Sequence, residues 1–215
     1  KDAYFLRGSA ELELGDYESA KADFDKAISM DPKNYDRLIE IYEALADYGY
    51  REVGQEYLQN VLNTDKKLDA YDSGRIYYYL GDYQKAYLAL EEAKGKGGVD
   101  SYLYLGKAYA ATGDYNYASS VYSNYLSKQG PDAEIYNQLG LCEMAKKDYQ
   151  KALEAFQAGK QIEGNSLMQT LSFNEIVAYE YLQDYQKAAV LLKAYLQNYP
   201  DDQAAIREQQ FLSTR

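Results

Sequence analysis

The stretch YLYLGKAYAATGDYNYA, which runs from Tyr102 to Ala118, decides the fold predicted for this chain. Its apolar or small residues recur at the i, i+3, i+4 and i+7 spacing of one helical face, at Tyr102, Leu105, Gly106 and Tyr109. Gly113-Asp114 interrupts this pattern, and a second periodic run begins at Tyr115. The stretch therefore predicts a helical hairpin in which the second helix folds back on the first.

Two small residues mark the place where these helices should touch. A side chain larger than a methyl group at Gly106 or Ala118 would hold the two helix axes apart. The larger side chains near them are expected to fill the space around the contact; these are Tyr102, Leu105, Tyr109 and Tyr115.

The same pattern recurs along the chain and resembles the tetratricopeptide repeat, a unit of about 34 residues with a W-x2-LG-x2-Y pattern followed by a small residue, an aromatic residue and a proline. Tyr102 takes the tryptophan slot in the quoted stretch. The first 34 residues fill the marker slots most completely, with Tyr4, Gly8, Gly15-Asp16-Tyr17, Ala20, Phe24, Ala27 and Pro32. The resemblance implies an all-α fold, a right-handed α-solenoid of about six helical hairpins.

The spacing of the turn residues sets the bounds of the repeats. Tyr17, its equivalents and Arg51 in the second unit lie 34, 32, 32, 34 and 36 residues apart by subtraction of residue numbers. The predicted units cover about residues 1–34, 35–66, 67–98, 99–132, 133–166 and 167–202, and a capping helix is expected over 203–212. All three prolines fall at unit ends, at Pro32, Pro131 and Pro200. We therefore expect residues 1–215 to form a single array.

The second and sixth units depart from the pattern. In the second unit Tyr42 replaces the close-contact glycine and Gly54 replaces the alanine, so its helices are expected to be splayed or tilted. In the sixth unit, counting back from the turn places Glu175 in a leucine slot and Ile176 in the glycine slot. Because an unpaired buried carboxylate is costly, we expect a slip of one residue that turns Ile176 inward instead.

Composition excludes several classes of function. The net charge of -11 opposes binding to nucleic acid or to anionic lipid, and no apolar run approaches the length of a membrane span. The chain has no histidine, hence no histidine-based triad, metal ligand or imidazole base, and we expect no enzyme, no cofactor and no metal. The single cysteine, Cys142, is expected to be a small buried thiol. The glycine-rich run Lys94–Gly98 lacks the G-x4-G-K-[ST] order of a phosphate loop and is interpreted as a flexible link.

The resemblance implies a concave groove lined by the first helix of each unit. Mapping its slots onto this sequence gives an aromatic middle section with two cations, composed of Tyr71, Arg75, Tyr78, Tyr79, Tyr104 and Lys107. It also gives an acidic end, with Glu40, Glu43 and Asp47 at i, i+3 and i+7 on one helical face. Each set has a second interpretation, since the tyrosines could stiffen neighbouring hairpins and the acidic run could be a solvated surface. The lysine and asparagine clamp of the chaperone-binding members is absent.

These features favour a non-enzymatic scaffold whose groove binds a peptide or a helix of a protein partner, with a basic partner segment suited to the acidic end. A carbohydrate-binding accessory protein that uses the same tyrosines is the alternative, and a self-assembling structural module is a third; the chain itself is expected to be a monomer or weakly self-associating. The repeat pattern is already running at Lys1, so we expect a fragment or a processed chain. A signal or lipid anchor before Lys1 would make the location extracytoplasmic rather than cytoplasmic.

Overall fold

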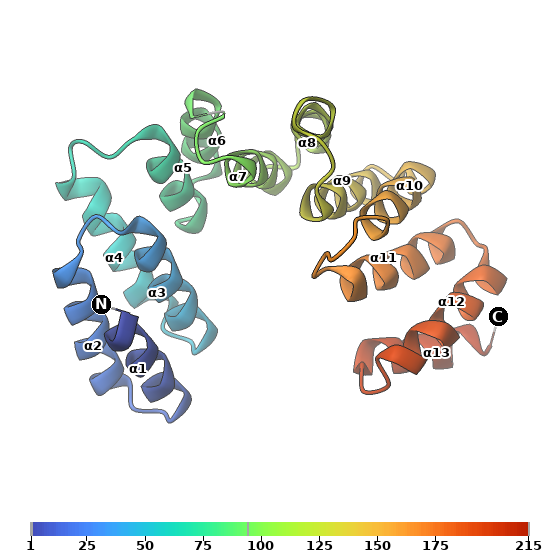
Figure 1. Ribbon diagram of the computed structural model, residues 1–215, viewed down its shortest axis with the longest axis horizontal. Coiled ribbons are helices and arrows are strands. Elements are labelled where there is room, and N and C mark those ends of the chain that lie inside the picture. Colours follow the sequence, from blue (N-terminus) through green and yellow to red (C-terminus); the bar gives the residue numbers. More distant parts are fainter. Residues whose placement is uncertain (1, 94, 215) are drawn as a thin grey trace. The chain divides into compact units, whose positions relative to one another are not determined.

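The computed structural model describes residues 2–93 and 95–214, and within them the chain forms thirteen α-helices and no strand (Figure 1). The helices are α1 Asp2–Glu13, α2 Tyr17–Met30, α3 Tyr35–Asp47, α4 Arg51–Thr64, α5 Ala70–Tyr79, α6 Tyr83–Glu92, α7 Val99–Ala111, α8 Tyr115–Gln129, α9 Ala133–Ala145, α10 Tyr149–Lys160, α11 Met168–Tyr181, α12 Tyr185–Asn198 and α13 Gln203–Leu212. Consecutive helices pair as hairpins, from α1 with α2 to α11 with α12, and α13 packs on α12 as the predicted capping helix. The all-α fold of stacked hairpins is therefore confirmed.

The contacts divide the chain into two compact units, Lys1–Lys94 with α1 to α6 and Gly95–Arg215 with α7 to α13. Each unit has its own buried apolar clusters, for example Leu12, Phe24 and Ile41 in the first and Ile176, Leu192 and Tyr195 in the second. A single continuous array remains a prediction. Lys1 and Lys94 lie outside the described residues. The expectation of a fragment or processed chain depends partly on Lys1, and that of a flexible link partly on Lys94.

The turn inside the first, third and fourth hairpins follows from three residues. Gly15, Gly81 and Gly113 end their helices with φ between +78° and +84°, a conformation that glycine adopts without strain. The next residue is an aspartate whose carboxylate accepts a hydrogen bond from the backbone N–H three residues on, as Asp114 does from Tyr117. The predicted turn tyrosine is then the first residue of the second helix, so the Gly-Asp-Tyr marker encodes a helix end, a cap and a helix start.

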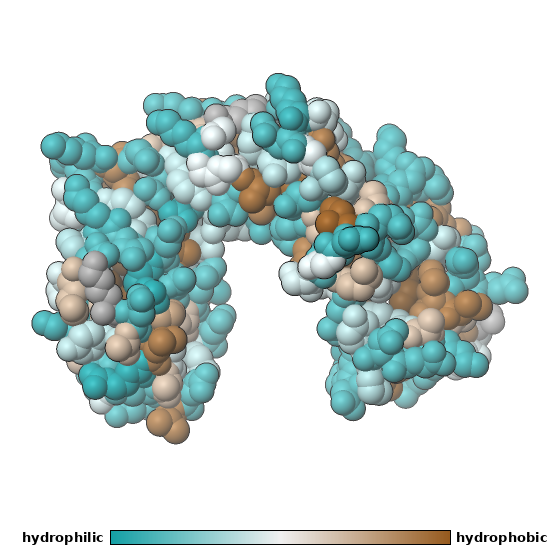
Figure 2. Space-filling model, viewed as in Figure 1, coloured by the Kyte–Doolittle hydropathy of each residue, from teal (hydrophilic) through white to brown (hydrophobic). Residues whose placement is uncertain are grey.

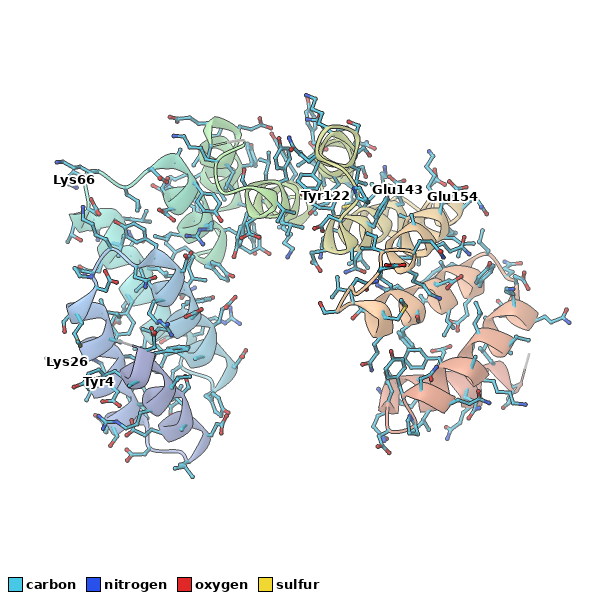
Figure 3. The ribbon with its side chains drawn as sticks, in the orientation of Figure 1. Tyr4, Lys26, Lys66, Tyr122, Glu143 and Glu154 are labelled. Carbon is cyan, nitrogen blue, oxygen red and sulfur yellow. The ribbon has the colours of Figure 1, made fainter. Side chains whose placement is uncertain are left out.

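The predicted close contact between the helices of a hairpin is confirmed, and its main partner is a side chain 16 positions after the glycine. A Cβ atom built on Gly106 would overlap the ring of Tyr122, which is fully buried between α7 and α8 (Figure 3). The same relation joins Gly8 to Phe24 and Gly140 to Phe156. The sequence analysis placed small residues correctly at this contact but did not identify the ring that occupies the space.

The second hairpin makes a different close contact, between Tyr42 in the glycine slot of α3 and Gly54 in the alanine slot of α4. Tyr42 is buried, and a Cβ atom on Gly54 would lie 2.9 Å from Cδ2 and 3.2 Å from Cα of Tyr42. The backbones of α3 and α4 therefore approach closely at this point, contrary to the predicted splay. The physical reason is that Gly54 of the second helix leaves room for the large side chain of Tyr42 on the first.

The sixth hairpin corrects the predicted slip. Ile176 is buried against Ala188 and Leu192, and Glu175 is buried as well. Glu175 accepts hydrogen bonds from Lys160 Nζ at 2.6 Å and from Gln157 Nε2 at 2.9 Å. Because these donors satisfy the carboxylate, the helix keeps its register, and the penalty that motivated the slip does not arise.

Candidate functional site

The predicted site residues of the first unit lie on α3 and α5, which with α1 are the first helices of its three hairpins. We call the side chains of α1, α3 and α5 that contact one another the first-helix face; it comprises Asp2, Phe5, Asp36, Arg37, Glu40, Glu43, Tyr71, Asp72, Arg75 and Tyr79. These contacts run from α1 to α3 and from α3 to α5, so they join three hairpins. Figure 2 shows the surface of the unit as mainly hydrophilic, with separate hydrophobic spots.

Arg37 connects the first two hairpins. Its guanidinium lies over the ring of Phe5, with Cζ 4.2 Å from the ring centroid. It donates to Asp2 at 2.8 Å and forms an ion pair with Glu40 at 3.1 Å. Sequence analysis missed Arg37, although its spacing of three residues from Glu40 is the signal of an ion pair on one helix.

Arg75 forms the equivalent connection between the second and third hairpins. It is buried, lies over Tyr71 with Cζ 4.4 Å from the ring centroid, and donates to Asp36 and Asp72 at 2.5 Å each. Burial disfavours its charged form, but the two carboxylates outweigh this effect and raise the pKa of Arg75. Arg75 is therefore a buried cation paired with two carboxylates, and its contact with a partner stays a prediction.

Tyr79 and Tyr78 also link neighbouring residues of the first unit. The Tyr79 hydroxyl donates to Glu43 at 2.5 Å, and its ring meets Tyr42 edge-on at a centroid distance of 5.3 Å. Tyr78 packs against Tyr79 and Tyr83, with centroid distances of 5.5 and 5.7 Å. The structure therefore brings together the predicted tyrosines and the acidic run through Glu43. Asp47 is exposed near the end of α3.

Tyr104 and Lys107 belong to α7 of the second unit and are half-buried there. Lys107 Nζ lies 3.6 Å from Glu134 of α9. Further along the first helices of this unit, Asn174 donates to the buried Asn137 at 2.9 Å. The second unit thus carries its own polar row on α7, α9 and α11.

Several other tyrosines hold hairpins together through carboxylates. Tyr57 donates to Asp25 at 2.5 Å, and Tyr35 donates to Asp65. Burial and the hydrogen bond to Asp65 raise the pKa of Tyr35 to about 12. These bonds support the structural interpretation for much of the tyrosine content.

An open pocket of the first unit lies outside the first-helix face. It has a volume of about 660 Å³ and is bordered by α4, α5 and α6 through side chains that include Gln55, Gln59, Tyr77 and Lys85. None of the predicted site residues lines it. The described residues contain no group of three or more carboxylate or thiol side chains placed to hold a metal ion, and none of their helices combines the length and apolar character needed to cross a bilayer.

Cys142 is buried as the sequence predicts. Burial raises the pKa of its thiol to about 11, so the thiolate is scarce at neutral pH. The side chain fits the packing role expected of it.

Three models of the tetratricopeptide repeat match residues 1–34, 103–166 and 173–202, which together make up more than half of the chain. No curated protein sequence matches it. Among solved structures, PilW, described as a widely conserved type IV pilus biogenesis factor, is 16% identical with a TM-score of 0.67, over 98% of this chain and 97% of that chain. PilF from Pseudomonas aeruginosa is 19% identical with a TM-score of 0.59, over 100% and 97%. YrrB, described as a protein of the same repeat type with an unusual peptide-binding site, is 21% identical with a TM-score of 0.58, over 87% and 97%.

Proposed function

Because the chain belongs to the tetratricopeptide repeat family, we propose that it is a protein-interaction scaffold whose first-helix face binds a basic peptide or helical segment of a protein partner. The fold itself supports the general role, since proteins built from these repeats bind protein or peptide partners and generally act as scaffolds rather than as enzymes. Tyr104 and Lys107 would extend the same kind of contact on the second unit. The peptide-binding site described for YrrB is consistent with this use of the fold.

We propose a basic partner because the first-helix face is negatively charged. Its two arginines are each paired with two carboxylates inside the face. Several carboxylates remain exposed even though they are paired; the Asp2 and Asp36 side chains, for example, are 78% and 76% exposed. The face therefore presents negative charge to solvent, and a lysine-rich or arginine-rich segment complements it.

The decisive experiment begins with a peptide selected from a random library on the wild-type chain. We expect the selected sequences to be enriched in lysine and arginine. Glu40→Lys with Glu43→Lys should slow association by about tenfold at low salt and flatten its salt dependence, because the steering charge is reversed. Stopped-flow fluorescence of the labelled peptide measures both quantities.

Glu52→Lys with Glu56→Lys, at exposed positions of α4, is the matched control with the same change in net charge. An equal effect of both double variants would show that overall charge, and not the first-helix face, drives association. Tyr71→Ala with Tyr79→Ala should lower affinity in a chain that still gives a helical circular dichroism spectrum. Unchanged affinity in that variant would remove the tyrosines from the site.

The same protein tests the alternative ligand and the assembly state. Binding to a glycan array that is lost in the tyrosine double variant would replace the peptide proposal by a carbohydrate one. Light scattering that shows mass rising with concentration would instead support self-assembly.

A further inference from the structure

A hollow of about 500 Å³ lies in the second unit, where α13 meets the turn between α11 and α12. Its lining consists of Glu180, Tyr181, Tyr185, Glu208 and Phe211. Glu180 and Tyr181 are the last two residues of α11, Tyr185 begins α12, and Glu208 and Phe211 lie three residues apart on α13. Three helices thus bring two carboxyl groups and three aromatic rings to one place.

The two carboxyl groups interact with each other. Oε1 of Glu180 is buried without a hydrogen-bond partner, and among the described residues no lysine or arginine forms an ion pair with Glu180 or Glu208. Burial first, and then the charge and the hydrogen bond of Glu208, raise the pKa of Glu180 to about 7. Near neutral pH the Glu180–Glu208 pair therefore retains a proton. A bound cation could replace that proton and neutralise the charge of the two carboxylates.

The aromatic rings are an independent feature of the hollow. Tyr181 is 57% exposed and Phe211 is 40% exposed, so both side chains reach the solvent at the hollow. The Tyr181 ring is held in place by stacking on Tyr149 at a centroid distance of 4.9 Å. Ring faces attract cations, and guanidinium groups stack on them while donating to carboxylates.

We propose that this hollow is a second docking site, which takes the side chain of an arginine presented by a protein partner. The guanidinium would donate to Glu180 and Glu208, release their shared proton to solvent, and pack against Tyr181 and Phe211. Charge complementarity selects the occupant, because two carboxylates and aromatic rings match a planar organic cation better than any anion or neutral group. The site lies on α11 to α13 and does not depend on the first-helix face of the first unit.

The test uses the full chain and two probes, N-acetyl-arginine methylamide and its neutral citrulline analogue. Two-dimensional NMR should show saturable shifts of Glu180, Tyr181, Glu208 and Phe211 with the arginine probe and none with the citrulline probe. Affinity should be about tenfold or more weaker at about pH 5 than at about pH 8, because only a small fraction of the pair is then free of its proton. Equal binding of the two probes, or no saturable shift, would overturn the proposal.

Matched variants separate the site from general charge effects. Glu208→Gln should weaken the arginine probe about tenfold or more, whereas Glu163→Gln, at an exposed position of the same unit, should leave affinity unchanged. Glu180→Gln provides a second variant if Glu208→Gln loses its native spectrum. An equal effect of the Glu163 and Glu208 substitutions would reject the site.

Discussion

At the scale of single residues, several hairpins depend on one glycine facing one large side chain. The pairs Gly8 with Phe24, Gly106 with Tyr122 and Gly140 with Phe156 leave no room for a Cβ atom on the glycine. The glycine of the turn between the two helices is less strictly required. In the fifth and sixth hairpins Lys147 and Gln183 take its place and adopt φ of 64° and 63°. A left-handed turn residue therefore tolerates substitution better than the glycine in the interhelical contact.

We predict that Gly106→Ala lowers the free energy of unfolding by about 1–3 kcal/mol, because the new methyl group overlaps the buried ring of Tyr122. Urea unfolding of a double-mutant cycle measures this. In a Tyr122→Ala background the same change should be neutral or stabilising, since the ring is gone and alanine favours a helix over glycine by about 1 kcal/mol. An equal loss in both backgrounds would show that the ring is not the cause.

At the scale of helices, the packing of α10 against α11 includes an ion pair of the buried Glu175, in the slot where the fourth and fifth hairpins have Leu105 and Leu139. Lys160 and Gln157 of α10 satisfy Glu175 of α11. Breaking such a pair leaves a buried charge, whereas replacing both members with apolar groups does not. The pair therefore fixes the register of α11 at the position where periodicity alone is ambiguous.

Lys160→Met should destabilise the chain by about 1–3 kcal/mol, because it removes the cation beside the buried Glu175 carboxylate and leaves Gln157 as its remaining donor. Lys160→Met with Glu175→Leu should recover most of that loss by restoring the repeat's leucine. Thermal and urea unfolding of the two variants make the comparison. A double variant no more stable than Lys160→Met alone would contradict this account of the register.

The contact of α11 with α13 should make stability depend on pH. Glu180 has a pKa of about 7 in the folded chain against 4.5 for an ordinary glutamate, so the folded state holds a proton that the unfolded state releases. The free energy of unfolding should therefore fall as pH rises from about 4.5 to about 7. Glu208→Gln should flatten this fall, which urea unfolding at about pH 5 and about pH 8 detects. Glu163→Gln should retain the wild-type slope, and a wild-type slope in Glu208→Gln would refute the coupling.

Much of the arrangement of the helices could be predicted from the sequence. Periodicity and the Gly-Asp-Tyr marker placed the hairpins and the capping helix, because those signals are local. The errors arose where the outcome depends on a partner distant in the sequence. Gln157 and Lys160 satisfy the buried Glu175, and Gly54 makes room for Tyr42. The sequence likewise did not reveal that Asp36 and Asp72 pair with Arg75, whose contact with a partner stays a prediction.

At the scale of the whole molecule, the contacts form two compact units rather than one central core. Stability in a repeat protein is close to a sum of repeat and neighbour terms, so a local defect should remain local. We predict that Gly106→Ala increases amide hydrogen exchange in α7, α8 and α9 but leaves α1 to α4 unchanged. Exchange measured by mass spectrometry resolves the two units, and a uniform increase over all helices would instead indicate one cooperative fold.

The close fit of Tyr42 against Gly54 also has a consequence for how this hairpin could have evolved. A larger side chain at position 54 would overlap Tyr42, and a smaller one at position 42 would leave a void. We therefore expect selection to act on the combined volume of the two positions, so that a substitution at one is best tolerated together with a compensating change at the other.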